Sequence, residues 1–278
     1  MTRIIAISSQ KGGVGKTSTA VNLAALLNHA GHRTLIVDWD PQGNATSALS
    51  AARPAEPPLR RLLEHPDDWD RVTTYTVERN LFLVPAAAPV DLASDLIDFD
   101  PDLPFSLRRG LLRSTDYEFV LIDSPPTLGP LGRFALHVAD SALIPVQCEP
   151  FAVQAVGQLL DQLREIEVER GRGLEVEGIL LTMFDEELPL SFEITDDLRE
   201  RYPDQLLETV IPRDVAIAES SGKGLPICEY DLRSRGAWAY LRLAKEISSH
   251  VRESQETRPR AGLADSVERR SGVRRADS

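Results

Sequence analysis

Apolar positions along the chain fall into short continuous runs that alternate with longer segments in which apolar residues recur every three or four positions. Continuous runs are typical of strands buried on both faces of a parallel sheet, and the wider spacing is typical of helices. The runs predict strands at residues 4–8, 34–37, 81–84, 119–122, 141–146, 178–183 and 209–211. The wider spacing predicts helices at residues 16–30, 104–113, 153–168 and 236–251.

This alternation predicts an α/β fold: a single domain, residues 1–253, with a mostly parallel twisted sheet flanked by helices on both faces. Residues 51–58 contain three prolines and are expected to form a surface excursion without regular structure. From residue 254 the chain is rich in Ser, Arg and Glu and cannot bury enough apolar surface to offset the entropy of ordering. Residues 254–278 are therefore predicted to be a disordered tail.

A glycine-rich loop, Gln-Lys-Gly-Gly-Val-Gly-Lys-Thr-Ser at residues 10–18, follows the first predicted strand and opens the first predicted helix. Such a loop aims several backbone N–H groups at one point, and its glycines let the backbone approach a phosphate closely. Gln10 stands where the general pattern has its first glycine. The loop predicts a P-loop site for a nucleoside triphosphate, in which Lys16 reaches the β- and γ-phosphates and Thr17 holds Mg²⁺. The residues expected to contact the nucleotide are Gly12, Gly13, Val14, Gly15, Lys16, Thr17 and Ser18.

Two carboxylates, Asp38 and Asp40, end the second predicted strand. Residues two apart on a strand point the same way, and ligands bind at the carboxyl edge of a parallel sheet. Asp38 is expected to contact Mg²⁺ through water and Asp40 to orient the attacking water, with residues 42–44 as a switch-like loop. Asp123 closes another strand and is expected to hold Mg²⁺ through water, because hard cations prefer oxygen. Hydrolysis at such a site depends on positioning and charge neutralisation, so slow turnover is expected.

Charge and composition narrow the class of protein. The 278 residues carry 31 basic and 43 acidic side chains, a net charge of −12, which argues against a surface that broadly coats nucleic acid. From residue 256 onward the balance reverses, with six arginines against four acids. Two cysteines without metal-ligand spacing, the lack of a bilayer-spanning apolar run and the lack of a signal peptide predict a cytoplasmic protein.

The sequence Lys-Gly-Gly-Val-Gly-Lys-Thr at residues 11–17 resembles the deviant Walker A motif of the ParA/MinD family of ATPases. Segments 38–47, 144–149, 181–185, 210–213 and 231–236 look like the Soj/ParA chromosome-partitioning branch. The resemblance implies an ATP-dependent homodimer in which Lys11 crosses the interface and touches the partner's phosphates, adding Lys11 to Lys16 and Asp40 as catalytic groups. It also implies a ParB-like partner that triggers hydrolysis, and nonspecific DNA binding by the dimer. By the same analogy, Met183, Pro212 and Arg213 lie near the adenine.

The chain departs from this branch where arginines are expected to bind DNA. It has Glu186 and Glu187 after residues 183–185, and Ala216 after residues 212–215. Phosphate contacts supply most nonspecific DNA affinity, so each missing arginine weakens binding, and Glu187 repels the phosphates. The remaining basic candidates are Arg213, Lys223, Arg233, Arg235, Arg242 and Lys245, together with the arginines of the tail.

Two alternatives to DNA partitioning stay open. One is an orphan ParA/MinD-like ATPase that positions a protein cargo without strong nucleoid binding. A membrane anchor is not expected, because the apolar stripe of the last predicted helix is typical of packing against the body. That stripe consists of Ala237, Trp238, Leu241, Ala244, Ile247 and Val251. The other alternative is a metabolic P-loop enzyme such as a synthetase, which requires a pocket for a second substrate.

Overall fold

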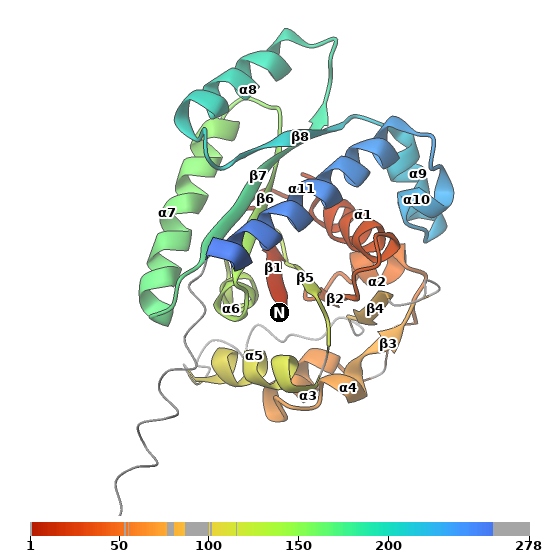
Figure 1. Cartoon of the computed structure of the whole chain (residues 1–278), viewed down its shortest axis with the longest axis vertical. Coiled ribbons are helices and arrows are strands. Elements are labelled where there is room, and N and C mark those ends of the chain that lie inside the picture. Colours follow the sequence, from red (N-terminus) through yellow and green to blue (C-terminus); the bar gives the residue numbers. More distant parts are fainter. Residues whose placement is uncertain are drawn as a thin grey trace, which may run out of the picture.

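The computed structural model contains one twisted sheet built from strands distributed along the chain (Figure 1). It describes residues 2–257 apart from 53, 55, 77–80, 87–99, 101 and 115. The strands are β1 (Arg3–Ile7), β2 (Thr34–Asp38), β3 (Thr74–Tyr75), β4 (Leu81–Val84), β5 (Phe119–Asp123), β6 (Ser141–Gln147), β7 (Glu175–Phe184) and β8 (Leu206–Pro212). In the described chain their order is β3-β4-β2-β5-β1-β6-β7-β8, and every neighbouring pair is parallel except β3 with β4.

Helices cover both faces of this sheet (Figure 1). One layer contains α1 (Lys16–His29), α2 (Asn44–Ala48), α9 (Val215–Lys223), α10 (Ile227–Tyr230) and α11 (Arg235–Thr257). The other contains α3 (Pro58–Glu64), α4 (Trp69–Val72), α5 (Leu103–Ser114), α6 (Pro130–Val138), α7 (Ala152–Arg170) and α8 (Pro189–Arg201). Successive strand residues point to opposite faces, so Ile5 and Ile7 pack in the first layer while Ile4 and Ala6 pack in the second. This burial on both faces explains the continuous apolar runs of the sequence.

Every predicted strand and helix is present, and the α/β fold with a mostly parallel sheet is confirmed. Two strands, β7 and β8, exceed their predicted length by four residues each. β7 begins at Glu175, before the apolar run that predicted it. The carboxylates of Glu175 and Glu177 pair with Arg3 of β1, so charged residues form the start of this strand. β8 lies at the end of the sheet order and alternates buried with more exposed residues, so only its centre was predicted. Several elements were not predicted from the sequence: β3, α8 and the shorter helices α2, α3, α4, α6, α9 and α10.

The last helix, α11, continues to Thr257, beyond its predicted end at 251 and the predicted domain boundary at 253. Residues 258–278 lie outside the described residues, so the disordered tail stays a prediction. Of the predicted apolar stripe, Ala237, Ala244 and Ile247 are buried against the body, whereas Trp238 is exposed. Within residues 2–257, gaps excepted, no helix is long and apolar enough to cross a membrane.

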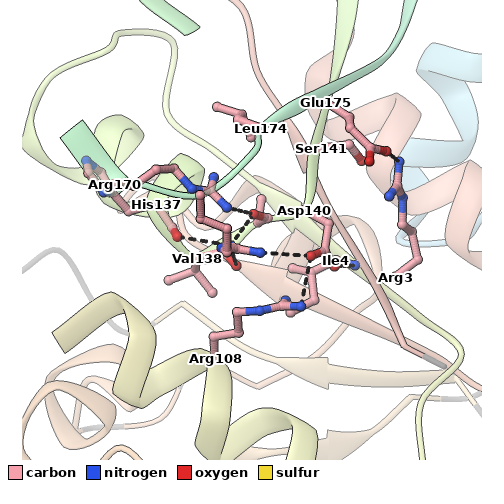
Figure 2. Close-up of polar contacts among 12 residues, drawn as sticks. Arg3, Ile4, Arg108, His137, Val138, Asp140, Ser141, Arg170, Leu174 and Glu175 are labelled. Carbon is pink, nitrogen blue, oxygen red and sulfur yellow. Dashed lines mark hydrogen bonds and ion pairs between the residues drawn. The ribbon is translucent and has the colours of Figure 1, made fainter. Parts of the chain in front are cut away.

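Asp140 connects several elements at the amino edge of the sheet (Figure 2). Its carboxylate accepts a hydrogen bond from the Ile4 amide at 3.0 Å and pairs with Arg108 of α5 at 2.9 Å and with Arg172 at 3.0 Å. Arg170 of α7 donates to the Ala139 carbonyl at 2.7 Å, just beyond the end of α6. Burial lowers the pKa of the Arg170 guanidinium to about 10. These contacts fix the edge of the sheet that is opposite to the phosphate loop.

Candidate nucleotide-binding site

The loop between β1 and α1 has the backbone geometry of a phosphate cradle. Gly13 (φ 78°) and Gly15 (φ 87°) are left-handed, a conformation that glycine adopts without steric cost, and Gly15 caps the start of α1. Lys16, the first residue of α1, is 7% exposed, and its Nζ donates to the Lys11 carbonyl at 3.0 Å. The Lys16 ammonium therefore lies over the loop, where a phosphate is expected.

Two contacts hold this loop in place. The Thr182 hydroxyl of β7 donates to the Val14 carbonyl at 2.9 Å. The side-chain amide of Gln10 bonds to Gln162 of α7, which directs it away from the glycines. Gln10 therefore replaces the first glycine of the general pattern without filling the cradle.

Three oxygen-bearing side chains meet beside the loop. Asp38 and Asp123 are register partners on the adjacent strands β2 and β5. The Thr17 hydroxyl donates to Oδ2 of Asp123 at 2.8 Å, while Oδ2 of Asp38 accepts the Thr46 amide at 2.7 Å and the Thr46 hydroxyl at 2.6 Å. Within the described chain, Oδ1 of both aspartates is buried without a hydrogen-bond partner. Such atoms are costly unless a ligand satisfies them.

Burial also shifts the ionisation of these groups. Burial, reinforced by the neighbouring Asp38, raises the pKa of Asp123 to about 8. Burial raises the pKa of Asp38 to about 6. Burial lowers the pKa of Lys16, although Asp123 and Asp40 oppose the shift. A divalent cation would favour both ionised carboxylates, so this set of hard oxygen atoms fits Mg²⁺.

Asp40 shapes the loop that follows β2. Its Oδ1 accepts the Gln42 amide at 2.9 Å, and its carbonyl accepts the Gly43 amide at 2.8 Å. Gly43 is left-handed (φ 64°) and caps α2, which begins at Asn44. The predicted switch-like loop is thus a turn organised by Asp40, which is itself buried at the carboxyl edge of the sheet. Its role in orienting water stays a prediction.

Lys11 has a partner in its own chain. Its Nζ forms an ion pair with Glu149, in the connection between β6 and α7, and its side chain is 56% exposed. The pair borders a cavity of about 270 Å³ whose walls include Val14, Ile144 and Leu159. Its polar walls are formed by Ser9, Gln10, Gln147 and the Lys11–Glu149 pair itself. The exposed ammonium of Lys11 is accessible to another molecule once Glu149 releases it.

The three predicted adenine contacts lie together at the carboxyl edge of β7 and β8. Phe184 and Pro212 are register partners, and the Arg213 amide donates to the Phe184 carbonyl at 2.8 Å. Met183 has a left-handed backbone (φ 51°), which is uncommon for a residue other than glycine. Its neighbour Thr182 touches the phosphate loop. Contact with the base stays a prediction.

The candidate DNA contacts are exposed, but acids lie near them. All six basic side chains proposed for this role are exposed, along α9, α11 and the connections that precede them: Arg213, Lys223, Arg233, Arg235, Arg242 and Lys245. Glu186 and Glu187 are also exposed, and Ala216 is half-buried. The missing arginines are therefore not replaced at the same positions.

Two residues of the site had no role assigned from the sequence. Thr46 binds Asp38 through its amide and its hydroxyl, and Glu149 binds Lys11. Both belong to segments that resemble the Soj/ParA branch, at 38–47 and 144–149, and that resemblance is the only signal that pointed to them. The contact between Lys11 and Glu149 joins residues 138 positions apart, which no local pattern encodes.

Comparisons with known proteins extend over most of the chain. A model of the AAA domain family matches residues 2–176. The sporulation initiation inhibitor protein Soj of Bacillus subtilis (strain 168) is 42% identical over 255 residues, covering 90% of this chain and 100% of that protein. The chromosome-partitioning ATPase Soj of Treponema pallidum (strain Nichols) is 38% identical over 249 residues, covering 89% and 97%, respectively.

Two solved structures share the fold. Cobyrinic acid a,c-diamide synthase from Mycobacterium smegmatis, with a bound ATP analog and magnesium, has a TM-score of 0.77 and 29% identity, covering 91% of this chain and 97% of that one. The septum site-determining protein MinD from Pyrococcus horikoshii OT3, complexed with Mg-ADP, has a TM-score of 0.73 and 27% identity, covering 90% and 98%. Both proteins bind a magnesium nucleotide on this architecture.

Proposed function

Because the chain belongs to the Soj/ParA family of ATPases, we propose that it is an ATP-dependent, Mg²⁺-dependent switch that dimerises with ATP, hydrolyses it slowly and segregates DNA. The main support for the proposal is that the two lysines of the phosphate loop differ in burial and direction. Lys16 is buried over its own cradle, whereas the Lys11 side chain is 56% exposed and held by Glu149. A lysine that faces outward from a phosphate loop suits contact with the nucleotide of a second copy.

The residues of one subunit bind and orient the nucleotide. Backbone N–H groups of residues 12–17 and the Lys16 ammonium bind the phosphates. Thr17 and Asp123 would hold Mg²⁺, with Asp38 contacting it through water. The bound ion supplies charge neutralisation on the phosphate oxygens.

Hydrolysis needs a positioned water and neutralised charge. Asp40 is the candidate for orienting the water, and Lys11 of the second copy is the candidate for neutralising the charge that develops on the phosphates. The ion pair with Glu149 must open before Lys11 can act in that way. A requirement for a second subunit, with no strong base, accounts for slow basal turnover that a ParB-like protein would accelerate.

DNA binding by the dimer is the second part of the proposal. The basic residues exposed on α9, α11 and their connections, together with the arginines after residue 257, are the candidate phosphate contacts. Nonspecific DNA binding of this kind would associate the protein with the nucleoid. Glu187 and Ala216 favour a second candidate function, an orphan ATPase that positions a protein cargo without binding the nucleoid.

Retention on nonspecific duplex DNA, with ATP or ADP and across a salt series, separates these two functions. ATP-dependent retention that falls steeply with salt is expected for DNA segregation, because each phosphate contact releases counterions. ATP-driven dimerisation without retention at low salt would support the cargo-positioning ATPase instead. The ATP hydrolysis rate measured on the same samples tests the ATPase itself.

A further inference from the structure

The start of α8 and the residues before it expose an unusual combination of apolar and acidic side chains. We define the α8 surface as Glu186, Glu187, Leu188, Leu190, Phe192 and Glu193, all of which are exposed. The apolar members are 50%, 37% and 49% exposed for Leu188, Leu190 and Phe192, respectively. Isolated exposed apolar residues are ordinary, but three within five positions form a patch of the kind that marks an interaction site.

Most of this surface is left exposed when α8 packs onto the body; the Phe192 ring contacts Phe184 of β7 and is still 49% exposed. The apolar residues of α8 that are buried in the core shared with α7 are Ile194 and Leu198. An amphipathic helix needs one apolar face for such packing. The exposed apolar residues at the start of α8 are additional to it.

The α8 surface is held in a fixed shape. The Phe192 ring packs edge-to-face on Phe184 at 5.2 Å between ring centroids. The Asp185 carboxylate accepts the Glu187 amide at 3.0 Å, and the Asp185 carbonyl accepts the Leu188 amide at 3.2 Å. A surface ordered in this way loses little conformational entropy when a partner binds.

The charge of this region is strongly negative. Residues 185–201 contain seven carboxylates and two arginines, and Arg199 is paired with Asp196 of the same helix. No basic side chain of the described chain forms an ion pair with Glu186, Glu187 or Glu193. Acids near the start of a helix are favoured by its dipole, but that effect does not account for the three exposed apolar residues beside them.

This combination indicates the chemistry of the partner. Carboxylates repel the phosphates of nucleic acid and the headgroups of an anionic membrane. Lysine or arginine side chains, in contrast, can pair with the carboxylates while neighbouring apolar side chains cover Leu190 and Phe192. We propose that the α8 surface is a docking site for a basic, amphipathic segment of a partner protein.

Binding of a basic amphipathic peptide tests the proposal in the full chain without nucleotide, so its result is independent of the ATPase. The probe is a fluorescein-labelled 14-residue peptide of leucine and lysine at helical spacing, and its control has glutamate in place of lysine. The triple variant Glu186→Lys, Glu187→Lys, Glu193→Lys is expected to bind the lysine peptide about tenfold more weakly than the natural chain. Leu190→Ser, which keeps all charges, is expected to weaken binding severalfold.

A matched variant controls for the overall charge of the acidic protein. Glu64→Lys, Asp70→Lys, Glu165→Lys makes the same charge change at exposed positions on α3, α4 and α7. It is expected to change peptide affinity by no more than about twofold at 150 mM salt, because charges distant from the bound peptide are screened. Equal weakening by both triple variants, or no binding of the lysine peptide to the natural chain, would overturn the proposal.

Backbone amide NMR identifies the surface directly. The lysine peptide is expected to shift amide resonances of residues 185–193 in the natural chain, and to need about tenfold more peptide for the same shifts in the α8 triple variant. Shifts confined to other elements would overturn the proposal. Shifts of residues 185–193 caused by a nonspecific DNA duplex instead of the peptide would assign the surface to nucleic acid and would overturn it as well.

Discussion

Asp38 and Asp123 face each other as register partners on β2 and β5, and each has one buried oxygen without a hydrogen-bond partner in the described chain. Two buried carboxylates so arranged are unfavourable when both are ionised and uncompensated. The metal-free protein therefore carries a local instability that a divalent cation would remove. This relationship gives the first prediction.

Stability of the metal-free chain should fall as pH rises from about 4 to about 8. An unfolded aspartate has a pKa near 3.9, whereas the folded values are about 6 for Asp38 and about 8 for Asp123. The folded state thus binds more protons in this window, so raising the pH destabilises it. We expect Asp123→Asn to raise the free energy of unfolding at pH 8 by roughly 1–3 kcal/mol, with the gain shrinking toward pH 5. Urea unfolding with EDTA at several pH values measures it, and a gain that does not vary with pH would contradict it.

Lys11→Ala should abolish ATP-driven dimerisation or stimulated hydrolysis, and nucleotide binding by the monomer should stay unchanged. The reason is that Lys16, not Lys11, lies over the cradle of its own chain. Light scattering with ATP measures the dimer, and a fluorescent ATP analogue measures monomer binding. Lys223→Ala, at an exposed lysine that ends α9, is the control. Unaltered stimulated turnover in Lys11→Ala would rule out action across the dimer.

Glu149→Gln should favour the ATP dimer, because it releases Lys11 from its partner in the same chain. An exposed ion pair contributes at most about 1 kcal/mol and the dimer opens one in each subunit, so we expect dimerisation to tighten by no more than about thirtyfold. Sedimentation across a protein concentration series gives the dissociation constant. Glu165→Gln removes an exposed acid of α7 as a control. A weaker dimer in Glu149→Gln would mean that Glu149 contributes to the interface itself.

Asp40→Ala should trap the ATP dimer. Its carboxylate is buried at the carboxyl edge of the sheet and is the candidate for orienting water. Loss of that role is expected to lower the hydrolysis rate by about 10²-fold or more. Light scattering should show a dimer that persists long after the natural protein has returned to monomer. Hydrolysis at the natural rate in this variant would exclude the role.

Deleting residues 254–278 should remove any retention on nonspecific DNA. The segment from residue 256 carries six arginines against four acids, whereas the rest of the chain is strongly acidic. Each lost phosphate contact should reduce the slope of log affinity against log salt by about 0.9. The comparison variant Arg233→Ala, Arg235→Ala keeps the tail and changes two exposed arginines before and at the start of α11. Unchanged retention after the deletion would refute the role of the tail.

The nucleotide site was predictable from the sequence because its parts follow from the order of strands. Asp38 and Asp123 end two strands, Thr17 lies in the first turn of the helix that follows β1, and parallel strands bring their carboxyl ends to one edge. The position of Lys11 was not predictable, because its partner Glu149 lies 138 residues away. Neither was the α8 surface, since the pattern of Leu188, Leu190 and Phe192 does not reveal which side chains the body leaves uncovered.

The contacts of Asp140 have a mechanical consequence. They hold β1, α5 and the connection from α7 to β7 together at the amino edge of the sheet. The phosphate loop and the turn after Asp40 lie at the opposite rim. The ten residues of β7 span about 33 Å from that fastening to the rim at Phe184. Because β7 pairs with β6 and β8 along this length and leads directly into the turn before α8, one continuous strand joins the Asp140 contacts to the rim that carries both the phosphate loop and the α8 surface.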